Sequence, residues 1–424
     1  MDTNPNLLHF DDPTFWDEGA LREETDRVFN ICNDCRMCFS YCESFPTLFD
    51  AAEDNDYDVK QISKEKVDEI VDYCFECKLC YVNCPYKPPH DYMLDFPRLM
   101  LRAKAVKAKR DGIPLKEKLI SNTDRLGKLG SATAPLSNWG NRLKIVRKVV
   151  DSVAGIHPMR ELPQYHRETF PKWYKKQQPT KSADPTDKVV LFSTCLVNYN
   201  EPGIGKAAVK ILQHNNIEIE YPDQVCCGMP FLDVGDADNA VKNAKKNIDA
   251  IFPWIEKGYK LVIPEPTCSY MFRNEYPDIL KDDERAAQVA GNTFDFSEYL
   301  MQLHKEEKLN TEFSKKFDSV AYHIPCHMKA QSIGYKSRDL LNLITENRVQ
   351  MIEKCSCVDG TWGMRTEYHD LSLKYGKKLF RGLENSGAEN YCSDCSLAAM
   401  QVKQGTGDKP THPIEMLAAA YGLT

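Results

Sequence analysis

Eight cysteines near the start of the chain form two rows with identical spacing. Each row reads C-x2-C-x2-C-x3-C, and the second repeats the first 42 residues later. The rows comprise Cys32, Cys35, Cys38 and Cys42, then Cys74, Cys77, Cys80 and Cys84. Three thiolates on one tight loop can each hold one iron of a cubane, and the fourth iron needs a thiolate from elsewhere. The rows therefore predict two [4Fe–4S] clusters, with zinc or unligated thiols as the alternative.

The double row resembles the pattern of two-cluster ferredoxins, in which the last cysteine of each row serves the other cluster. The resemblance implies that one cluster is held by Cys32, Cys35, Cys38 and Cys84. It implies that the other is held by Cys74, Cys77, Cys80 and Cys42. Pro85 fits the ferredoxin pattern, whereas Glu43 follows Cys42 in the first row. We expect that departure to change the local turn and not the ligation.

The segments around the rows have helical character. We expect helices over 18–29, 65–71 and 93–109, the last broken only by Pro97. The expected unit is an α-helical two-cluster ferredoxin domain over 1–110. Prolines and turn signals then predict a basic helical connector over 111–185. Within it, 142–153 is amphipathic, which predicts a helix packed on the protein, with a membrane-surface helix as the alternative.

Beyond residue 186 the chain repeats itself. An apolar strand ending at Cys195, then Cys226-Cys227-Gly228 and Cys268, recurs as a strand ending at Cys326, then Cys355-Ser356-Cys357 and Cys395. The offsets are 131, 129 and 127 residues, which indicates a duplicated unit over 186–305 and 306–424. Strands alternating with helices predict parallel α/β sheets, so the expected fold class is α + α/β. Open α/β sheets place their sites at the carboxyl ends of strands, where these cysteines lie.

This domain order resembles iron–sulfur oxidoreductases that carry paired cysteine-rich CCG domains. The family includes the C subunit of anaerobic glycerol-3-phosphate dehydrogenase and the catalytic subunit of heterodisulfide reductase, and its motif is a cysteine, then Cys-Cys-Gly, then C-x2-C. Phrases such as Pro325-Cys326-His327 and Asp359-Gly360-Thr361-Trp362-Gly363 are also similar to a rubrerythrin-associated subgroup. The resemblance implies a further iron–sulfur cluster or zinc in the CCG domains.

Both copies depart from the family motif. The first copy offers four ligands, Cys195, Cys226, Cys227 and Cys268, which suit a cubane or a tetrahedral zinc. Aligning Cys268 with Cys395 puts Glu265 at a lost cysteine. The second copy offers five, Cys326, Cys355, Cys357, Cys392 and Cys395, with Ser356 inside the altered triplet. The alternative for both copies is a set of buried unligated cysteines, and we expect His323 and His327 to be structural.

Charge is distributed unevenly along the chain. Residues 1–60 carry 15 acidic against 4 basic side chains, and residues 101–180 carry 18 basic against 6 acidic ones. The basic stretch is interpreted as the solvated face of connecting helices, or as a docking surface for an acidic partner or an anionic membrane. Arg147 and Lys148 are the residues we expect to test such docking. Nucleic acid is not an expected partner of this acidic protein.

The leading functional hypothesis is an electron-transfer component and not a self-contained enzyme. Two ferredoxin clusters would pass electrons from a dehydrogenase subunit to a CCG site, and then, by family resemblance, to a quinone or a rubrerythrin-like peroxidase. The alternatives are a heterodisulfide or thiol–disulfide reductase and a zinc-stabilised docking scaffold. Without an apolar span or signal peptide, we expect a cytoplasmic protein of anaerobic cells, with a peripheral position at the inner face of the membrane as the alternative.

Overall fold

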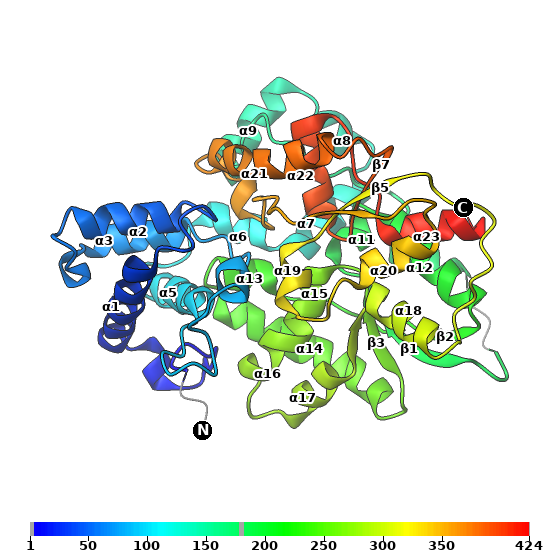
Figure 1. Cartoon of the computed structure of the whole chain (residues 1–424), viewed down its shortest axis with the longest axis horizontal. Coiled ribbons are helices and arrows are strands. Elements are labelled where there is room, and N and C mark those ends of the chain that lie inside the picture. Colours follow the sequence, from blue (N-terminus) through cyan, green and yellow to red (C-terminus); the bar gives the residue numbers. More distant parts are fainter. Residues whose placement is uncertain (1–3, 178–181, 424) are drawn as a thin grey trace.

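The two cysteine rows lie among helices at one end of the molecule, at the left of Figure 1. The computed structural model describes residues 4–177 and 182–423, so residues 178–181 of the predicted connector lie outside the described residues. Asp17 caps the first long helix by accepting a hydrogen bond from the backbone N–H of Ala20. The elements are η1 (Pro13–Trp16), α1 (Glu18–Cys35), α2 (Ser44–Glu53), η2 (Val59–Gln61), α3 (Lys64–Asp72), α4 (Leu79–Val82) and α5 (Phe96–Asp111).

Helix α5 corrects one prediction about this part of the chain. It begins at Phe96, after the cap residue Asp95, and not at residue 93. Pro97 lies in the first turn, where its missing N–H costs no intrahelical hydrogen bond. The proline therefore starts this helix and does not interrupt it.

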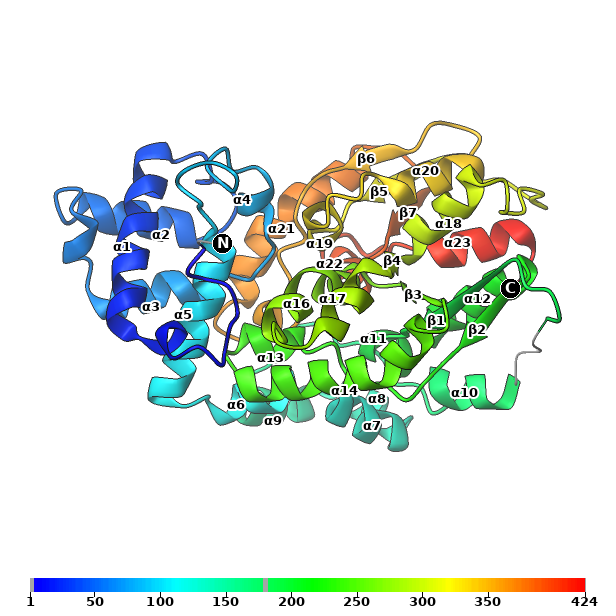
Figure 2. The ribbon, with the colours of Figure 1, turned by 90° about the horizontal axis from the view of Figure 1, so that it is seen from below.

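Five helices connect this end to the sheets and lie along one side of the molecule, the lower edge of Figure 2. They are α6 (Leu115–Ser121), α7 (Thr123–Ala132), α8 (Leu136–Gly140), α9 (Lys144–Ala154) and α10 (Phe170–Gln177). The predicted amphipathic helix is present as α9 and packs on α6, as expected. Its apolar residues Ile145, Val149 and Val153 are nevertheless exposed, so this part of the predicted apolar face points to solvent.

The first α/β unit contains a parallel sheet with the strand order β2-β1-β3-β4. Asp187 of β1 lies opposite Ile217 of β2, and Val189 lies opposite Lys260 of β3. The elements are β1 (Asp187–Leu191), α11 (Cys195–Tyr199), α12 (Pro202–His214), β2 (Ile217–Glu220), α13 (Met229–Asp233), α14 (Ala237–Ile255), β3 (Lys260–Ile263), α15 (Pro266–Tyr270), η3 (Met271–Glu275), α16 (Tyr276–Ile279), α17 (Glu284–Gly291), β4 (Thr293–Asp295) and α18 (Phe296–Lys305).

The second α/β unit repeats this plan with a smaller parallel sheet in the order β6-β5-β7. A parallel bridge between Cys392 and Thr411 lies where the first unit has β4. The elements are β5 (Val320–His323), α19 (Cys326–Ala330), α20 (Lys336–Leu343), β6 (Gln350–Ile352), η4 (Trp362–Met364), α21 (His369–Glu384), β7 (Asn390–Ser393), α22 (Ser396–Thr406) and α23 (Pro413–Tyr421). The predicted α + α/β fold class is confirmed.

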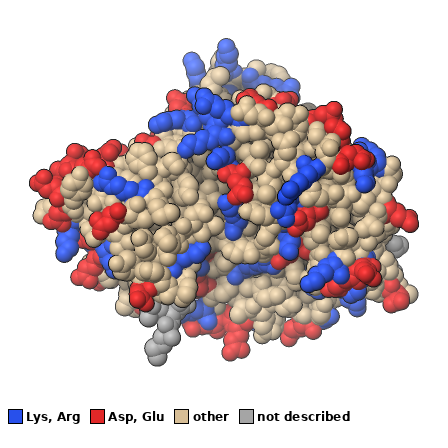
Figure 3. Space-filling view, viewed as in Figure 1, with Lys and Arg blue, Asp and Glu red and all other residues tan. Residues whose placement is uncertain are grey.

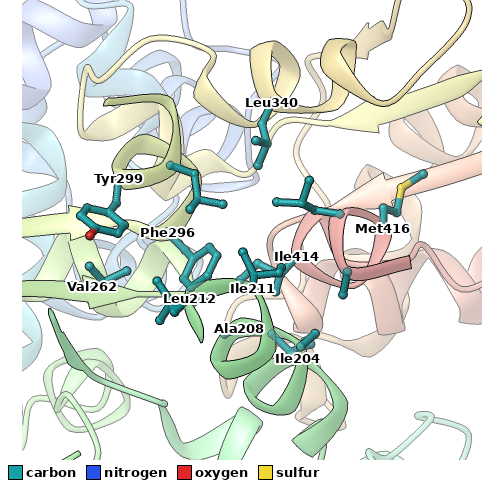
Figure 4. Close-up of a cluster of buried hydrophobic side chains, with 14 of the residues drawn as sticks. Ile204, Ala208, Ile211, Leu212, Val262, Phe296, Tyr299, Leu340, Ile414 and Met416 are labelled. Atoms are coloured by element: carbon teal, nitrogen blue, oxygen red, sulfur yellow. The ribbon is translucent and has the colours of Figure 1, made fainter. Parts of the chain in front are cut away.

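The two units exchange their last helices and share one core. Helix α23 of the second unit packs on α12 of the first, and α18 of the first packs on α20 of the second. Figure 4 shows Leu212 of α12 and Ile414 of α23 in one cluster with Phe296 and Leu340. Because the strands of both sheets contribute to this cluster, the two units stabilise each other.

Acidic and basic side chains gather on different parts of the molecular surface. Figure 3 shows acidic side chains gathered at the end formed by α2 and α3, and basic ones gathered at the top of the same view. The predicted basic stretch is only partly on the surface, since Arg102 and Lys104 are buried in α5 and Arg147 is buried in α9. Among the described residues, no helix combines the length and the apolar character that crossing a bilayer requires.

Candidate functional site

The ferredoxin rows surround two adjoining small cavities. One is lined by Cys32, Cys35, Cys38 and Cys84, and the other by Cys42, Cys74, Cys77 and Cys80. Cys80 lines the first cavity as well, so the cavities adjoin at this residue. Each row therefore sends its last cysteine to the cavity of the other row, as the ferredoxin resemblance implies. Which cysteines bind iron stays a prediction.

Left-handed residues shape the loops that present these cysteines. Arg36, Glu76 and Lys78 have φ values of 52°, 50° and 61°, which turn the chain tightly between successive thiols. Lys78 is 2% exposed, and its ammonium pairs with Glu76 at 2.8 Å and with Glu275 of η3 at 3.6 Å. The loop of the second row is thereby tied electrostatically to the first α/β unit.

The four cysteines of the first unit meet at the carboxyl end of its sheet. The sulfurs of Cys227 and Cys268 are 3.3 Å apart. Hydrogen bonds from the neighbouring thiols of Cys195 and Cys227 lower the pKa of Cys226, against the effect of burial. Asp124 of α7 accepts a hydrogen bond from the Cys226 backbone N–H at 2.7 Å. These hydrogen bonds therefore favour a thiolate at Cys226, and Asp124 of the connector holds the backbone of that residue in place.

Four of the five predicted cysteines of the second unit meet in the same way. The sulfurs of Cys326 and Cys355 are 3.3 Å apart, and the Cys357 backbone N–H donates to the Cys355 sulfur at 3.3 Å. Cys395 caps α22 and lines the same cavity. Hydrogen bonds from Cys326, Cys357 and Cys77 lower the pKa of Cys355. Cys77 belongs to the second ferredoxin row, so this row touches the second unit directly.

Cys392 does not belong to this set. It is 0% exposed on β7, where it packs in the core shared by the two units, and it does not line the cavity. Side chains alternate along a strand, so the face of β7 that carries Cys392 points into that core. The prediction of Cys392 as a ligand of the second site is therefore corrected.

The equivalence of Cys268 and Cys395 is corrected too. Glu265 caps α15 and Cys395 caps α22, so these two residues are the structural counterparts. Cys268 then corresponds to Ala398 of the second copy, and the offset becomes 130 residues. Each copy keeps one cysteine of a C-x2-C pair: the second member in the first copy and the first member in the second.

Both cysteine sets face one cavity of about 220 Å³ between the two units. Its lining includes Cys195, Cys226, Cys227, Cys268, Cys326, Cys355, Cys357 and Cys395, together with Cys77. Ile120, Leu126, Ile156 and Leu162 of the connector cover it and make its wall largely apolar. A small apolar molecule in this cavity would contact both sets of cysteines.

Three acidic residues line the cavity between the units, Asp233, Glu265 and Asp359, and Glu265 is the one that reaches from the first unit to Ser396 of the second. Glu265 is 4% exposed, and it accepts hydrogen bonds from the backbone N–H and the hydroxyl of Ser396. Burial raises its pKa to about 8, although these hydrogen bonds oppose the shift. Glu265 therefore carries a proton at neutral pH, at the wall of the cavity.

His327 is a residue that the sequence alone did not place at the site. Its Nε2–H donates to the backbone oxygen of Glu76 at 2.8 Å, and its Nδ1 accepts from the hydroxyl of Thr267 at 2.8 Å. Burial lowers its pKa to about 4, so the ring is neutral. His327 joins the second ferredoxin loop to both α/β units. In the sequence, only its position next to Cys326 indicated that His327 could lie at the site.

The donor set fits iron–sulfur clusters. Each ferredoxin cavity and each unit presents four thiols within a small volume, and cubane clusters are bound by four thiolates. Four thiols also fit tetrahedral zinc, so the α/β units do not discriminate between the two.

Family models match three segments of the chain. A cysteine-rich CCG domain matches residues 189–273 and 320–403, and the Fer4-like domain of citrate utilization protein B matches residues 25–110. The C subunit of anaerobic glycerol-3-phosphate dehydrogenase from Escherichia coli K12 is 30% identical over 309 residues, which is 72% of this chain and 77% of the relative. Lactate utilization protein A of Bacillus cereus G9842 is 32% identical over 188 residues, or 42% of this chain and 75% of the relative.

Proposed function

The chain belongs to the family of iron–sulfur electron-transfer subunits that includes the C subunit of anaerobic glycerol-3-phosphate dehydrogenase, and we propose that it delivers electrons from a dehydrogenase partner to an acceptor in the cavity between its CCG domains. The first ferredoxin row would receive the electrons, and the CCG cysteines would pass them on. Iron–sulfur clusters held by these thiolates supply one-electron redox chemistry.

The observation that carries this proposal is the continuity of the cysteine sets. Cys80 lines both ferredoxin cavities, and Cys77 lines both the second of these and the CCG cavity. The cysteines predicted to be redox ligands therefore form a continuous series from one end of the molecule to its centre. His327 and the Lys78–Glu76 pair are buried at this junction and tie the loop of the second row to the α/β units.

The exposed end of the series suits a partner subunit. Met37 and Phe39 lie in the first row and are 62% and 57% exposed, although both are apolar. Exposed apolar side chains beside a redox centre are typical of a surface that another protein covers. We place the entry of electrons at this end.

The acceptor that best fits the other end is a quinone. Its reduction takes two electrons and two protons, and the ring requires an apolar cavity with a few polar groups. The cavity offers apolar connector residues, and Glu265 holds a proton at its wall. A rubrerythrin-like peroxidase is too large to enter, so it would have to take electrons at the surface.

The test compares two cysteines of the second unit. In protein purified without oxygen and reduced by a low-potential dye, Cys355→Ala should abolish quinone reduction but keep the reduced-cubane EPR signals of the ferredoxin rows. Cys392→Ala, in the core, should keep both. Loss of quinone reduction in Cys392→Ala with intact folding, or full activity in Cys355→Ala, would contradict the proposal.

One observation favours a second candidate, a disulfide reductase. Both cysteine sets face the same cavity, so the two sulfurs of a small disulfide could each lie beside one set. Each set has four cysteines, one fewer than the complete family motif, which argues against this candidate. The two candidates are discriminated by offering a disulfide in place of the quinone in the same assay and measuring the release of thiols. Turnover of a disulfide and not of quinones would favour the disulfide reductase.

A further inference from the structure

Cys77 has cysteine neighbours on two sides. It lines the small cavity of the second ferredoxin row together with Cys74 and Cys80 of the same row. It also lines the cavity between the two α/β units, where its thiol lies within hydrogen-bonding distance of the sulfurs of Cys326 and Cys355. Those two sulfurs are themselves 3.3 Å apart. Thiols from two domains of the chain therefore meet at one point.

The loop that presents Cys77 does not copy the corresponding loop of the first row. Cys35, the equivalent residue 42 positions earlier, ends helix α1, so Asp34 before it is helical. Glu76, the residue before Cys77, has a φ of 50° instead, and the chain from Cys74 to Cys77 is not helical. A left-handed backbone at a residue other than glycine costs free energy, and it persists where the surroundings impose it. The rows share their spacing but present this cysteine differently.

Contacts with both α/β units impose this conformation. The backbone oxygen of Glu76 accepts a hydrogen bond at 2.8 Å from the Nε2–H of His327, which directly follows Cys326 in the sequence. The carboxylate of Glu76 is fully buried and pairs with Lys78, which also reaches Glu275 of the first unit. Helix α4 packs on α19, whose first residue is Cys326. These contacts hold the second ferredoxin loop against the cysteines of the second unit.

The second unit lacks one thiol of the complete family motif. Ser356 stands where the motif has the second cysteine of its triplet. The second set of thiols at the cavity therefore comprises only Cys326, Cys355, Cys357 and Cys395. Among the described residues that line this cavity, Cys77 is the one cysteine that neither unit contributes. With Cys77 the second set has five thiols, as many as the complete motif.

We propose that Cys77 is a shared ligand, whose sulfur binds both the metal of the second ferredoxin row and the metal of the second set. A thiolate sulfur keeps free lone pairs after it has bound one metal, so it can bind another on its opposite side. Thiolate ligands select iron or zinc, and the second set fits either. A shared sulfur would join the two sites directly. This inference goes beyond the proposed function, because it concerns the ligands of the metals and not the acceptor.

The test compares Cys77→Ala with Cys74→Ala in the full-length protein, purified without oxygen. Both remove a predicted ligand of the second ferredoxin row, but Cys74 does not line the cavity between the units. Iron, sulfide and zinc per chain are measured, together with EPR spectra of the reduced protein. Cys74→Ala should lose one ferredoxin cluster, about four irons, and keep the metal of the second set. Cys77→Ala should lose both.

Cys326→Ala identifies the contribution of the second set to these measurements. The loss of metal in Cys77→Ala should equal the losses in Cys74→Ala and Cys326→Ala together. A loss in Cys77→Ala equal to that in Cys74→Ala would overturn the proposal, because Cys77 would then serve the ferredoxin row alone. Unchanged metal content in Cys326→Ala would also overturn it, because the second set would then hold no metal.

A second measurement uses the wild-type protein and does not depend on the folding of any variant. The protein is treated with a chelator and with ferricyanide, which takes an electron from each of two thiolates as they form a disulfide. Mass spectrometry should find Cys77 linked to Cys326 or Cys355. Cys35, at the same position of the first row, should be linked to neither. The absence of any link from Cys77 to the second set would overturn the proposal.

Discussion

Glu265 illustrates how one residue exchange changes the chemistry of a duplicated site. It occupies the cap position that Cys395 holds in the other copy, and its carboxyl reaches across to Ser396. A thiol predicted to be a ligand is replaced by a carboxyl group, while the helix and the strand before it are retained. The first copy thereby gives a group suited to proton transfer to the shared cavity.

The raised pKa of Glu265 predicts a dependence of stability on pH. The Glu265 carboxyl releases its proton at about pH 8 in the folded protein and near pH 4.5 in the unfolded chain. Its contribution to the free energy of unfolding is therefore complete below pH 4.5 and is lost as the pH rises through 8. Glu265→Gln keeps the shape without the charge. The melting temperature of Glu265→Gln relative to wild type should rise by several degrees from pH 5.5 to pH 8.5 in anaerobic calorimetry, equivalent to a few kcal/mol.

Glu384→Gln, at an exposed side chain of α21, makes the same exchange and is the control for that experiment. Its melting temperature relative to wild type should be the same at pH 5.5 and pH 8.5. A pH-independent difference between wild type and Glu265→Gln would show that Glu265 is already ionised in the folded protein.

At the scale of elements, the sequence predicted what local spacing determines. The cysteine rows, the duplication and the parallel strands follow from short-range patterns, and the structure contains the corresponding elements. Cys392 was misassigned because a C-x2-C spacing does not reveal where the strand ends and the helix begins. The helix cap is Cys395, three residues after Cys392, so Cys392 still lies within β7, on the face that points into the core.

Contacts between distant segments could not be read from the sequence. The amphipathic pattern of α9 is the same whether its apolar side faces the core or solvent, and only the contacts of Arg147 decide between them. The junction of Cys77 with Cys326 joins residues about 250 positions apart, so no local pattern could indicate it. The exchange of α18 and α23 is hidden for the same reason.

The exchanged helix α23 predicts that the two α/β units unfold together. Leu417 is 0% exposed in the shared core. Leu417→Ala should reduce the free energy of unfolding by about 2–5 kcal/mol, because it leaves a cavity between the units. Urea unfolding followed by far-UV circular dichroism measures this change, and hydrogen exchange should report equal loss of protection in β1 and β5.

Leu136→Ala, at a side chain 70% exposed, should change the free energy of unfolding by less than about 0.5 kcal/mol and serves as the control. Loss of protection confined to β5 after Leu417→Ala would mean that the units fold independently.

On the scale of the whole molecule, three parts of the chain meet around one buried cation. The ammonium of Lys104 donates to the backbone oxygen of Cys74 at 2.7 Å and to Asp233 at 2.8 Å, and Thr361 donates to the same carboxylate. Burial lowers the pKa of Lys104, but Asp233 and Glu76 outweigh that effect and raise it. The charge is therefore permanent, and it lies where the second ferredoxin row meets both units.

Lys104→Met should affect both stability and redox potential. Removing the cation beside Cys74 leaves the buried Asp233 carboxylate with only the Thr361 hydroxyl and no cationic partner, and it makes the surroundings of the second row more negative. An added negative charge disfavours a reduced cluster, so the potential of the cluster on this row should fall on the order of 60 mV, a tenfold change for one electron. The melting temperature should fall by several degrees, as expected when one partner of a buried ion pair is lost.

EPR-monitored redox titration and anaerobic calorimetry measure the two effects. Lys109→Met on the exposed side of α5 is the control: it should leave the potential unchanged and lose only the contact of its ammonium with the Trp16 ring, about 0.5–1 kcal/mol. A potential unchanged in Lys104→Met, together with the expected loss of stability, would mean that Lys104 only fastens the three parts together and does not tune the electron path that runs through them.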